Sequence, residues 1–314
     1  MDKDEKQLLI EVSVMYYLEG KTQSEIARAL YLSRPKVSRL LKRARELDIV
    51  DIKINYESDG LTGLQNEIKR KFNLDNVVIV KTLSNYDDTL KEIGKASATV
   101  LIQEIKEEMT VGISWGRSIR SAVHYLPQKQ IRDVKIVELF GAISYDMNDT
   151  DMLSIGNEFS RKTDGKFYPL PAPIYIEDAN VRMALEKNPI IQRSLNMIES
   201  CDVILTGVGA IDGKSRIWEA YVEDDARARI KSHGGVGFIC AHFFDENGQF
   251  LDLDINDNIV GIKTESIKSN NIILVAGGKV KAKAILAALK GGYINTIISD
   301  DKTLEYVLEL SNKA

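Results

Sequence analysis

The hydrophobic positions divide the chain into two parts with different periods. Up to about residue 47, apolar residues recur at i, i+3 and i+4, which is the spacing of amphipathic helices. Beyond residue 75, short apolar runs rich in valine and isoleucine alternate with longer helical patterns. The pattern predicts a small all-α domain followed by a larger domain in which strands and helices alternate.

The first two helices of the N-terminal part are marked by their ends. Residues 4–18 form the first pattern, which Gly20 ends; its apolar positions are Leu8, Leu9, Val12, Met15 and Tyr16. Thr22 and Glu25 then have the T-x-x-E spacing of a capping box, which predicts a short helix over residues 23–31.

The third helix is expected from Ser33 as N-cap to Leu47, with Pro35 in the first turn, where the absence of an N–H costs nothing. One apolar stripe runs along it: Val37, Leu40, Leu41, Ala44 and Leu47. Residues 49–56, "IVDIKINY", alternate with period two and predict a strand or short wing.

Two short helices joined by a tight turn, the second of them basic, are typical of a helix-turn-helix. In that geometry the first turns of the second helix enter the major groove of double-stranded DNA. The residues expected to contact DNA are Thr22, Gln23, Ser33, Arg34, Lys36, Ser38, Arg39, Lys42 and Arg43. Of these, residues 34–39 would reach base edges, and Lys42 and Arg43 would meet phosphates.

The charge distribution favours the same interpretation. Residues 1–54 hold eleven Lys or Arg and nine Asp or Glu, a net charge of +2, on a chain whose overall charge is −4. Residues 33–45 contain six basic residues and no acidic one. A basic element on a weakly acidic protein is expected where one small face meets phosphate.

Residues 55–60, "NYESDG", are a plausible linker, so we expect a DNA-binding domain over 1–54 and an effector domain over 61–314. The strand-like runs of the second domain are 76–80, 110–114, 134–139, 202–209, 234–240, 271–278 and 295–300. Because these runs lack polar alternation and are separated by helical patterns, they predict a mostly parallel sheet covered on both faces.

The stretch "GISWGRSI", residues 112–119, has the composition of an anion-binding turn between a strand and a helix. Free backbone N–H groups from Ser114 to Ser118, together with the helix N-terminus, suit a phosphate. The two serines add hydroxyl groups, and Arg117 or Arg120 adds a charge-assisted contact. Two further turns, "GVGAI" at 207–211 and "AGGKVKAK" at 276–283, end strands in the same way.

These segments resemble the SorC/DeoR-type bacterial transcriptional regulators. "QSEIARALYLSRPKVSRLLKRARELDIVDIKI" is similar to their N-terminal pattern "IA..L..SR..VSRLL..A...GIV.I.I". "GISWGRS", "TGVGAI", "HFFDENG" and "AGGKVKAKAILAALKGGYINTIISD" follow in the order of their effector domain. The resemblance covers nearly the whole chain.

The resemblance implies a regulator of carbohydrate utilisation that forms a homodimer or homotetramer. Its effector domain would be related to sugar-phosphate isomerases and CoA transferases and would bind a phosphorylated sugar or polyol. Carried over by position, the effector-binding residues are Gly112, Ser114, Gly116, Arg117, Ser118, Gly209 and Lys281.

Two departures from the family pattern bear on the sugar end of the ligand. Phe140 and Ala142 stand where the family commonly has "L.GG", and Gly237-Phe238 stands where it has a glycine and an aspartate. We therefore add Phe140 and Phe238 to the expected effector-binding residues, for an effector that differs in shape or polarity from that of a typical member.

Several classes of protein are disfavoured. The chain has no apolar run long enough for a membrane span and no signal-peptide pattern, which predicts a cytoplasmic protein. Cys201 and Cys240 do not indicate a disulfide framework, and His124, His233 and His242 are scattered without metal-ligand spacing. We expect no cofactor, no metal and no catalytic residue.

Two alternatives remain open at the level of sequence. The first is a sugar-phosphate isomerase or transferase with an accessory helical domain, for which Asp212, Glu219, Asp300 and Asp301 could supply acid–base chemistry. The second is an interaction module whose basic helix binds an acidic partner other than DNA. Trp218 and Tyr221 could wall the ligand site or simply pack in the core.

Overall fold

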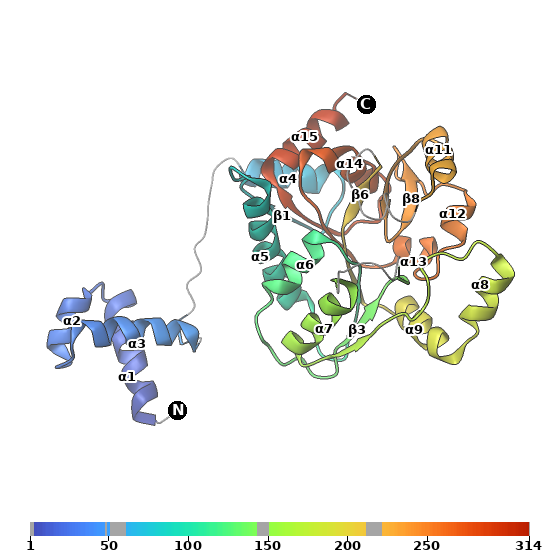
Figure 1. The fold of residues 1–314 in the computed structure, drawn as a ribbon. Coiled ribbons are helices and arrows are strands. Elements are labelled where there is room, and N and C mark those ends of the chain that lie inside the picture. Colours follow the sequence, from blue (N-terminus) through green and yellow to red (C-terminus); the bar gives the residue numbers. More distant parts are fainter. Residues whose placement is uncertain (1–2, 48, 51–60, 143–150, 212–221, 314) are drawn as a thin grey trace. The chain divides into compact units, whose positions relative to one another are not determined.

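The computed structural model describes residues 3–47, 49–50, 61–142, 151–211 and 222–313. The chain divides into two compact units, Met1–Glu57 and Ser58–Ala314 (Figure 1). The expected linker, 55–60, and most of the expected strand at 49–56 lie outside the described residues.

The N-terminal unit is built from helices. Its elements are α1 (Lys3–Ser13), a single π-helical turn (Val14–Leu18), α2 (Gln23–Ala29) and α3 (Arg34–Glu46). The predicted helix over 4–18 therefore changes its winding after Ser13, whose hydroxyl donates to the carbonyl oxygen of Leu9 at 2.7 Å. Such a bond back to the preceding turn often bends a helix.

The predicted apolar stripe of α3 forms most of the contact with α1 and α2. Val37, Leu41 and Ala44 are almost fully buried, and Leu40 is half-buried. Together with buried side chains of the other helices they form the core of this unit. The prediction is wrong for Leu47, which lies beyond the last turn of α3 and is 45% exposed.

The C-terminal unit contains a seven-stranded sheet with the order β1-β10-β9-β5-β2-β3-β4, in which every pairing is parallel. The strands are β1 (Asn76–Val80), β2 (Thr110–Ile113), β3 (Lys135–Glu138), β4 (Lys166–Tyr168), β5 (Val203–Thr206), β9 (Ile272–Val275) and β10 (Thr296–Asp300). The mostly parallel sheet predicted from the sequence is confirmed, and it contains one short edge strand, β4, that was not predicted. The run at 234–240, expected in this sheet, lies instead in the second, antiparallel sheet.

Helices cover both faces of this sheet (Figure 1). One face carries α5 (Tyr86–Glu104), α6 (Arg117–His124) and α7 (Asp151–Thr163); the other carries α4 (Leu61–Lys71), α9 (Pro189–Glu199), α14 (Ala282–Lys290) and α15 (Asp301–Ser311). Alternate residues of β9 point to opposite faces: Ile272 and Leu274 join one core cluster, Ile273 and Val275 the other. In the described part of the chain, every helix is too short or too polar to cross a membrane.

A second sheet has three antiparallel strands, β6 (Val208–Ala210), β7 (Gly235–Ile239) and β8 (His242–Asp245). The predicted single strand at 202–209 is wrong, because the chain leaves β5 at Gly207 and enters this other sheet. The described residues of this unit also contain the short helices α8 (Ala179–Glu186), α11 (Asp224–Ser232), α12 (Asp254–Asp257) and α13 (Thr264–Ser269).

The order of the strands places a switch point between β2 and β5. After β2 the chain proceeds to β3 and β4 at one edge, whereas after β5 it proceeds toward β9, β10 and the other edge. Ligands of open α/β sheets bind beyond the carboxyl ends of the strands at such a point. The turn at residues 114–116 follows β2 there.

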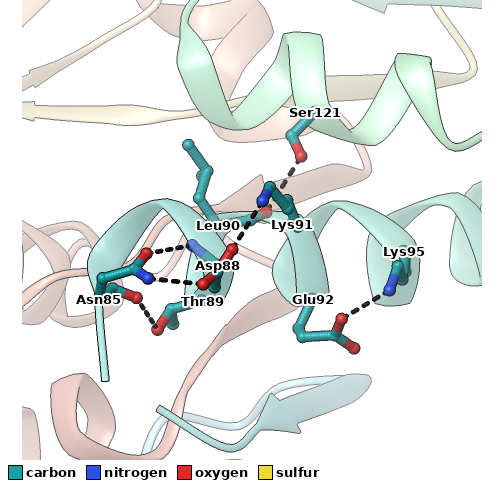
Figure 2. Close-up of polar contacts among 8 residues, drawn as sticks. All are labelled: Asn85, Asp88, Thr89, Leu90, Lys91, Glu92, Lys95 and Ser121. Carbon is teal, nitrogen blue, oxygen red and sulfur yellow. Dashed lines mark hydrogen bonds and ion pairs between the residues drawn. The ribbon is translucent and has the colours of Figure 1, made fainter. Parts of the chain in front are cut away.

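Figure 2 shows the polar contacts in the first turns of α5 and the hydrogen bond that joins α5 to α6. Asn85 caps α5 by accepting from the Asp88 amide at 2.8 Å, and the Ser121 hydroxyl of α6 donates to the Leu90 carbonyl of α5 at 3.0 Å. The helices approach closely at Gly94, where an added Cβ would lie 2.1 Å from Ser121 Oγ and 2.8 Å from the Ser121 carbonyl carbon.

We predict that Gly94→Ala destabilises the protein by about 1–3 kcal/mol, since one helix has to move away from the other to admit the methyl group. Chemical denaturation monitored by circular dichroism measures the change. Gly63→Ala in α4 is the matched control, because nothing lies within 4 Å of its added Cβ. Equal stabilities of the two variants would contradict the close contact at Gly94.

Candidate functional site

The capping box at the start of α2 is confirmed. The Glu25 amide donates to Thr22 Oγ1 at 3.3 Å, and the Thr22 amide and hydroxyl both donate to Glu25 Oε2 at 2.8 Å. The hydrogen bonds that the Thr22 amide and hydroxyl donate to the Glu25 carboxylate lower the pKa of Glu25. The Thr22 hydroxyl, expected at the DNA, is thus already engaged, and Gln23 beside it is half-buried.

Ser33 occupies the N-cap position of α3 with an extended backbone, and Pro35 lies in the first turn, as expected. The side chain of Ser33 makes no capping hydrogen bond, however, so the expected cap is wrong in that respect. The hydroxyl is exposed at the end of the helix that carries the basic residues.

The polar face of α3 lies opposite its buried stripe. Its first half presents four exposed side chains, Arg34, Lys36, Ser38 and Arg39. Neither Arg34 nor Lys36 forms an ion pair with any residue that the structure describes. Arg43, expected at a phosphate, pairs instead with Glu5 of α1 at 3.0 Å, and Lys42 is exposed.

Tyr31, expected as the last residue of the helix over 23–31, lies instead in the turn after α2 and is a further candidate for DNA contact. Its side chain is 97% exposed, and its backbone is in the left-handed region with φ of 54°. A residue other than glycine pays a conformational cost of order 1 kcal/mol there. The sequence offered one signal for this position. The turn "YLS" before the basic helix contains no glycine, so a residue with a side chain must adopt the left-handed conformation there.

In the C-terminal unit, two positive side chains from distant segments lie near each other. Arg117 is the first residue of α6, and Lys281 ends the 3₁₀ turn (Lys279–Lys281) before α14. Tyr86, the first residue of α5, links the two segments: its hydroxyl donates to the Gly277 carbonyl at 2.9 Å, and the Arg117 guanidinium lies 5.4 Å from its ring centroid. We call Tyr86, Arg117 and Lys281 the cation site.

The ammonium group of Lys281 is held in an unfavourable environment. The side chain is half-buried, and burial together with the positive charge of Arg117 lowers its pKa to about 8. No carboxylate among the described residues pairs with it. Arg117 has only an exposed contact with Asp87 at 3.8 Å, and Lys279 lies instead 4.2 Å from the ring centroid of Tyr306. An anion would relieve this accumulation of positive charge.

The turn before α6 is open on the side where a ligand would lie. Gly116 is the N-cap, with φ of 136°, and an added Cβ would meet no atom within 4 Å. The first amides of a helix have no partner within it, so those following Gly116 face this space. The Ser114 amide is not one of them: it donates to the Leu205 carbonyl at 3.0 Å, which corrects the expectation that it is free.

Three of the expected effector residues are buried around this turn. The side chains of Ser114 and Ser118 are each 5% exposed. Gly112 lies inside β2, where an added Cβ would be 2.6 Å from Leu139 Cδ2 and 2.9 Å from Cys201 Sγ. Gly112 is therefore required by the close packing of β2 against the side chains of Leu139 and Cys201, and its role toward an effector stays a prediction.

The two phenylalanines expected at the sugar end occupy different places. Phe140 is buried, and its ring centroid lies 6.1 Å from that of Trp115 in the turn after β2. Phe238 is buried in the small sheet, against Phe243 at 5.3 Å and across Gly209, whose added Cβ would be 2.0 Å from the Phe238 ring. Gly209 and Phe238 thus pack against each other, and their contact with an effector also stays a prediction.

The acidic residues considered for acid–base chemistry have structural partners. Asp300 caps α15, accepting from the Thr303 amide and hydroxyl at 2.9 and 2.7 Å and from the Gly278 amide at 3.0 Å. Asp301 accepts from the Thr82 amide and hydroxyl at 2.9 and 2.6 Å, and these bonds keep its pKa low in spite of burial. Asp212, Glu219, Trp218 and Tyr221 lie outside the described residues.

His242 is not suited to proton transfer at the cation site. It is buried in β8, its Nε2 lies 2.8 Å from the Ile262 carbonyl, and burial lowers its pKa to about 4. In the described residues, no group of three His, Cys, Asp or Glu side chains could hold a metal ion.

Glu138, the last residue of β3, is a buried carboxyl group that the sequence analysis missed. It is 7% exposed and accepts from the Leu170 amide at 3.0 Å. Burial raises its pKa to about 7, with the hydrogen bond opposing the shift. The acidic residue at the end of the apolar run "VKIVEL" was the available signal.

The comparisons with known proteins agree with this division into two units. Residues 56–309 match the family model of a sugar-binding domain (Sugar-bind), and residues 6–46 match the model of sigma-70 region 4. The chain is 30% identical over 306 residues to the deoxyribonucleoside regulator of Bacillus subtilis, covering 96% of this chain and 97% of that protein. It is 28% identical to the sorbitol operon regulator of Klebsiella pneumoniae, covering 98% and 99%.

A solved structure gives the same picture. The crystal structure of the full-length sorbitol operon regulator SorC from Klebsiella pneumoniae superimposes with a TM-score of 0.81 at 26% identity, covering 98% of this chain and 99% of that one.

We predict that Glu138→Gln is more stable than the unchanged protein at pH 8, by about 2–3 kcal/mol, and equally stable near pH 4.5. The folded-state pKa, about 7, lies above the ordinary value of 4.5, so ionisation costs stability as pH rises through this range. The amide retains an acceptor for Leu170. Denaturation curves between pH 4.5 and 8 measure the difference. Glu104→Gln, an exposed change of equal charge, should have the same stability as the unchanged protein at every pH. If the stability of Glu138→Gln also differs from that of the unchanged protein by a constant amount at every pH, the raised pKa of Glu138 is contradicted.

Proposed function

This chain belongs to the SorC/DeoR-type family of sugar-binding transcriptional regulators, and we propose that it regulates a carbohydrate-utilisation operon under the control of a phosphorylated sugar or polyol. The observation that carries the effector half of this proposal is the cation site, where Lys281 and Arg117 stand together beside an open helix N-terminus.

The DNA-reading half rests on α3. Its buried stripe fixes the helix on α1 and α2, so Arg34, Lys36, Ser38 and Arg39 project together from the opposite face. Arginine and lysine in the first turns of such a helix can donate to guanine edges, and we assign the exposed Ser33 and Lys42 to phosphate contacts. Arg43 would first have to exchange Glu5 for a phosphate.

A phosphate monoester suits the cation site better than a neutral sugar does. It carries close to two negative charges at neutral pH and accepts several hydrogen bonds, so it can engage the amides after Gly116 together with Arg117 and Lys281. The relatives named for sorbitol and for deoxyribonucleosides suggest the carbon skeletons to test.

We favour sensing over catalysis, because Asp300 and Asp301 use their oxygens to hold backbone and hydroxyl groups. An isomerase needs a positioned acid and base, and these carboxylates have other partners. The effector would act by shifting the population of DNA-competent homodimers or homotetramers, and a symmetric oligomer implies a palindromic operator.

We predict that Arg39→Ala relaxes sequence preference in DNA binding, since one base-edge contact contributes about 1–3 kcal/mol of discrimination. Selection from a random duplex library, followed by titration of the preferred duplex at several salt concentrations, measures this. Arg45→Ala, an exposed change of equal charge in the last turn of α3, is the control and should keep the preference. A full-length protein without any sequence preference would contradict the regulator proposal.

We predict that affinity for sorbitol 6-phosphate is constant from pH 7 to about 7.5 and then falls, approaching tenfold per pH unit above pH 8.5, because Lys281 with its pKa near 8 must be protonated to bind. The phosphate ionises near pH 6, so its charge does not change in this range. Isothermal titration calorimetry gives the profile. Lys281→Arg keeps its charge and should flatten it. Binding that is independent of pH in both proteins would remove Lys281 from the site.

A further inference from the structure

Trp115 lies in the turn between β2 and α6, next to the glycine that opens this turn. Its ring contacts the core clusters on both faces of the large sheet and the cluster of the small sheet. It is tilted by 60° against Phe140, with the ring centroids 6.1 Å apart. The position of the indole is therefore set by packing from three sides, and the side chain does not need a ligand to orient it.

Among the residues that the structure describes, the indole N–H of Trp115 has no hydrogen-bond partner. The Nε1 atom is buried, and no described acceptor lies within reach of it. Indole nitrogen is a donor only, and buried tryptophan usually finds an acceptor. A buried donor left without one lowers stability by an amount comparable to a lost hydrogen bond. The Trp115 N–H would be satisfied by an oxygen atom that accepts a hydrogen bond from it.

The distance to the cation site is short. Trp115 and Arg117 are separated by one residue, Gly116, and two residues span at most about 7 Å of extended chain. A carbon chain of four to six atoms anchored by its phosphate at Arg117 and Lys281 is long enough to bring a hydroxyl group to Trp115.

We propose that Trp115 is an effector-binding residue whose Nε1–H donates a hydrogen bond to a hydroxyl oxygen on the carbon chain of the phosphorylated ligand. The inference rests on the proposed function, since it takes the phosphate to lie at the cation site. It assigns the recognition of the polyhydroxylated part to Trp115, and it accounts for the unpaired donor in a protein without ligand.

The first test separates the two ends of the ligand. Trp115→Phe keeps an aromatic ring and removes the N–H. The matched control is Tyr293→Phe, which removes another buried donor without a described partner, before the amino end of β10. The probes are sorbitol 6-phosphate, 2-deoxyribose 5-phosphate and inorganic phosphate, titrated by calorimetry. We expect Trp115→Phe to bind the better sugar phosphate about tenfold more weakly and inorganic phosphate unchanged. Tyr293→Phe should match the unchanged protein with every probe.

The second test does not depend on the folding of the Trp115 variant. The chain has two tryptophans, so Trp218→Phe labelled with ¹⁵N-tryptophan shows the Trp115 indole as a single N–H resonance. A hydrogen bond to the ligand should move the proton resonance downfield with the sugar phosphate but not with inorganic phosphate.

The outcomes separate the inference from the proposed function. If a sugar phosphate binds with equal affinity to the unchanged protein and to Trp115→Phe, and the indole resonance does not move, the inference is overturned and the proposed function stands. Equal losses for the sugar phosphate and for inorganic phosphate, with a stationary resonance, would assign Trp115 to packing alone. If neither sugar phosphate binds the unchanged protein, the proposed function fails, and the inference with it.

Discussion

The parallel pairing of β2 with β5 is the constraint on which the C-terminal unit depends. Each parallel connection must cross back over a face of the sheet, so the chain leaves these neighbouring strands toward opposite edges. The segments that follow them therefore diverge and leave space above the sheet. Gly116, with open surroundings, borders that space, and the helices α5 and α6 bring Tyr86 and Arg117 to it.

The same arrangement accounts for the electrostatics of the site. Arg117 and Lys281 come from opposite halves of the sheet order; Lys281 has no ion pair with a described carboxylate, and Arg117 pairs with the exposed Asp87 at 3.8 Å. Two buried acids nearby have other partners. Asp300 caps α15 and accepts from the Gly278 amide, and Asp301 accepts from the Thr82 amide. The molecule thus keeps a positive site by giving its negative groups other partners.

Much of this could be predicted from the sequence, because the strongest signals are local. The capping box at Thr22, the buried stripe of α3 and the unbroken apolar runs of β1 and β10 depend on neighbours in sequence, and the structure bears them out. What could not be predicted depends on contacts between distant segments. The change of sheet at Gly207, the ion pair of Arg43 with Glu5, and the packing of Phe238 on Gly209 have no local signature. Lys281 was found as a residue, but its lowered pKa arises first from burial and then from the charge of Arg117, more than 160 positions earlier in the chain.

The contact between α5 and α6 has a mechanical consequence. The Ser121 hydroxyl bond to Leu90 and the absence of a side chain at Gly94 join the two helices closely enough that neither slides without the other (Figure 2). Helix α5 has 19 residues, so its last turn lies about 27 Å from Tyr86. The two helices therefore behave as one rigid element that begins at the cation site. We therefore expect a ligand that shifts Arg117 to move α5 together with α6.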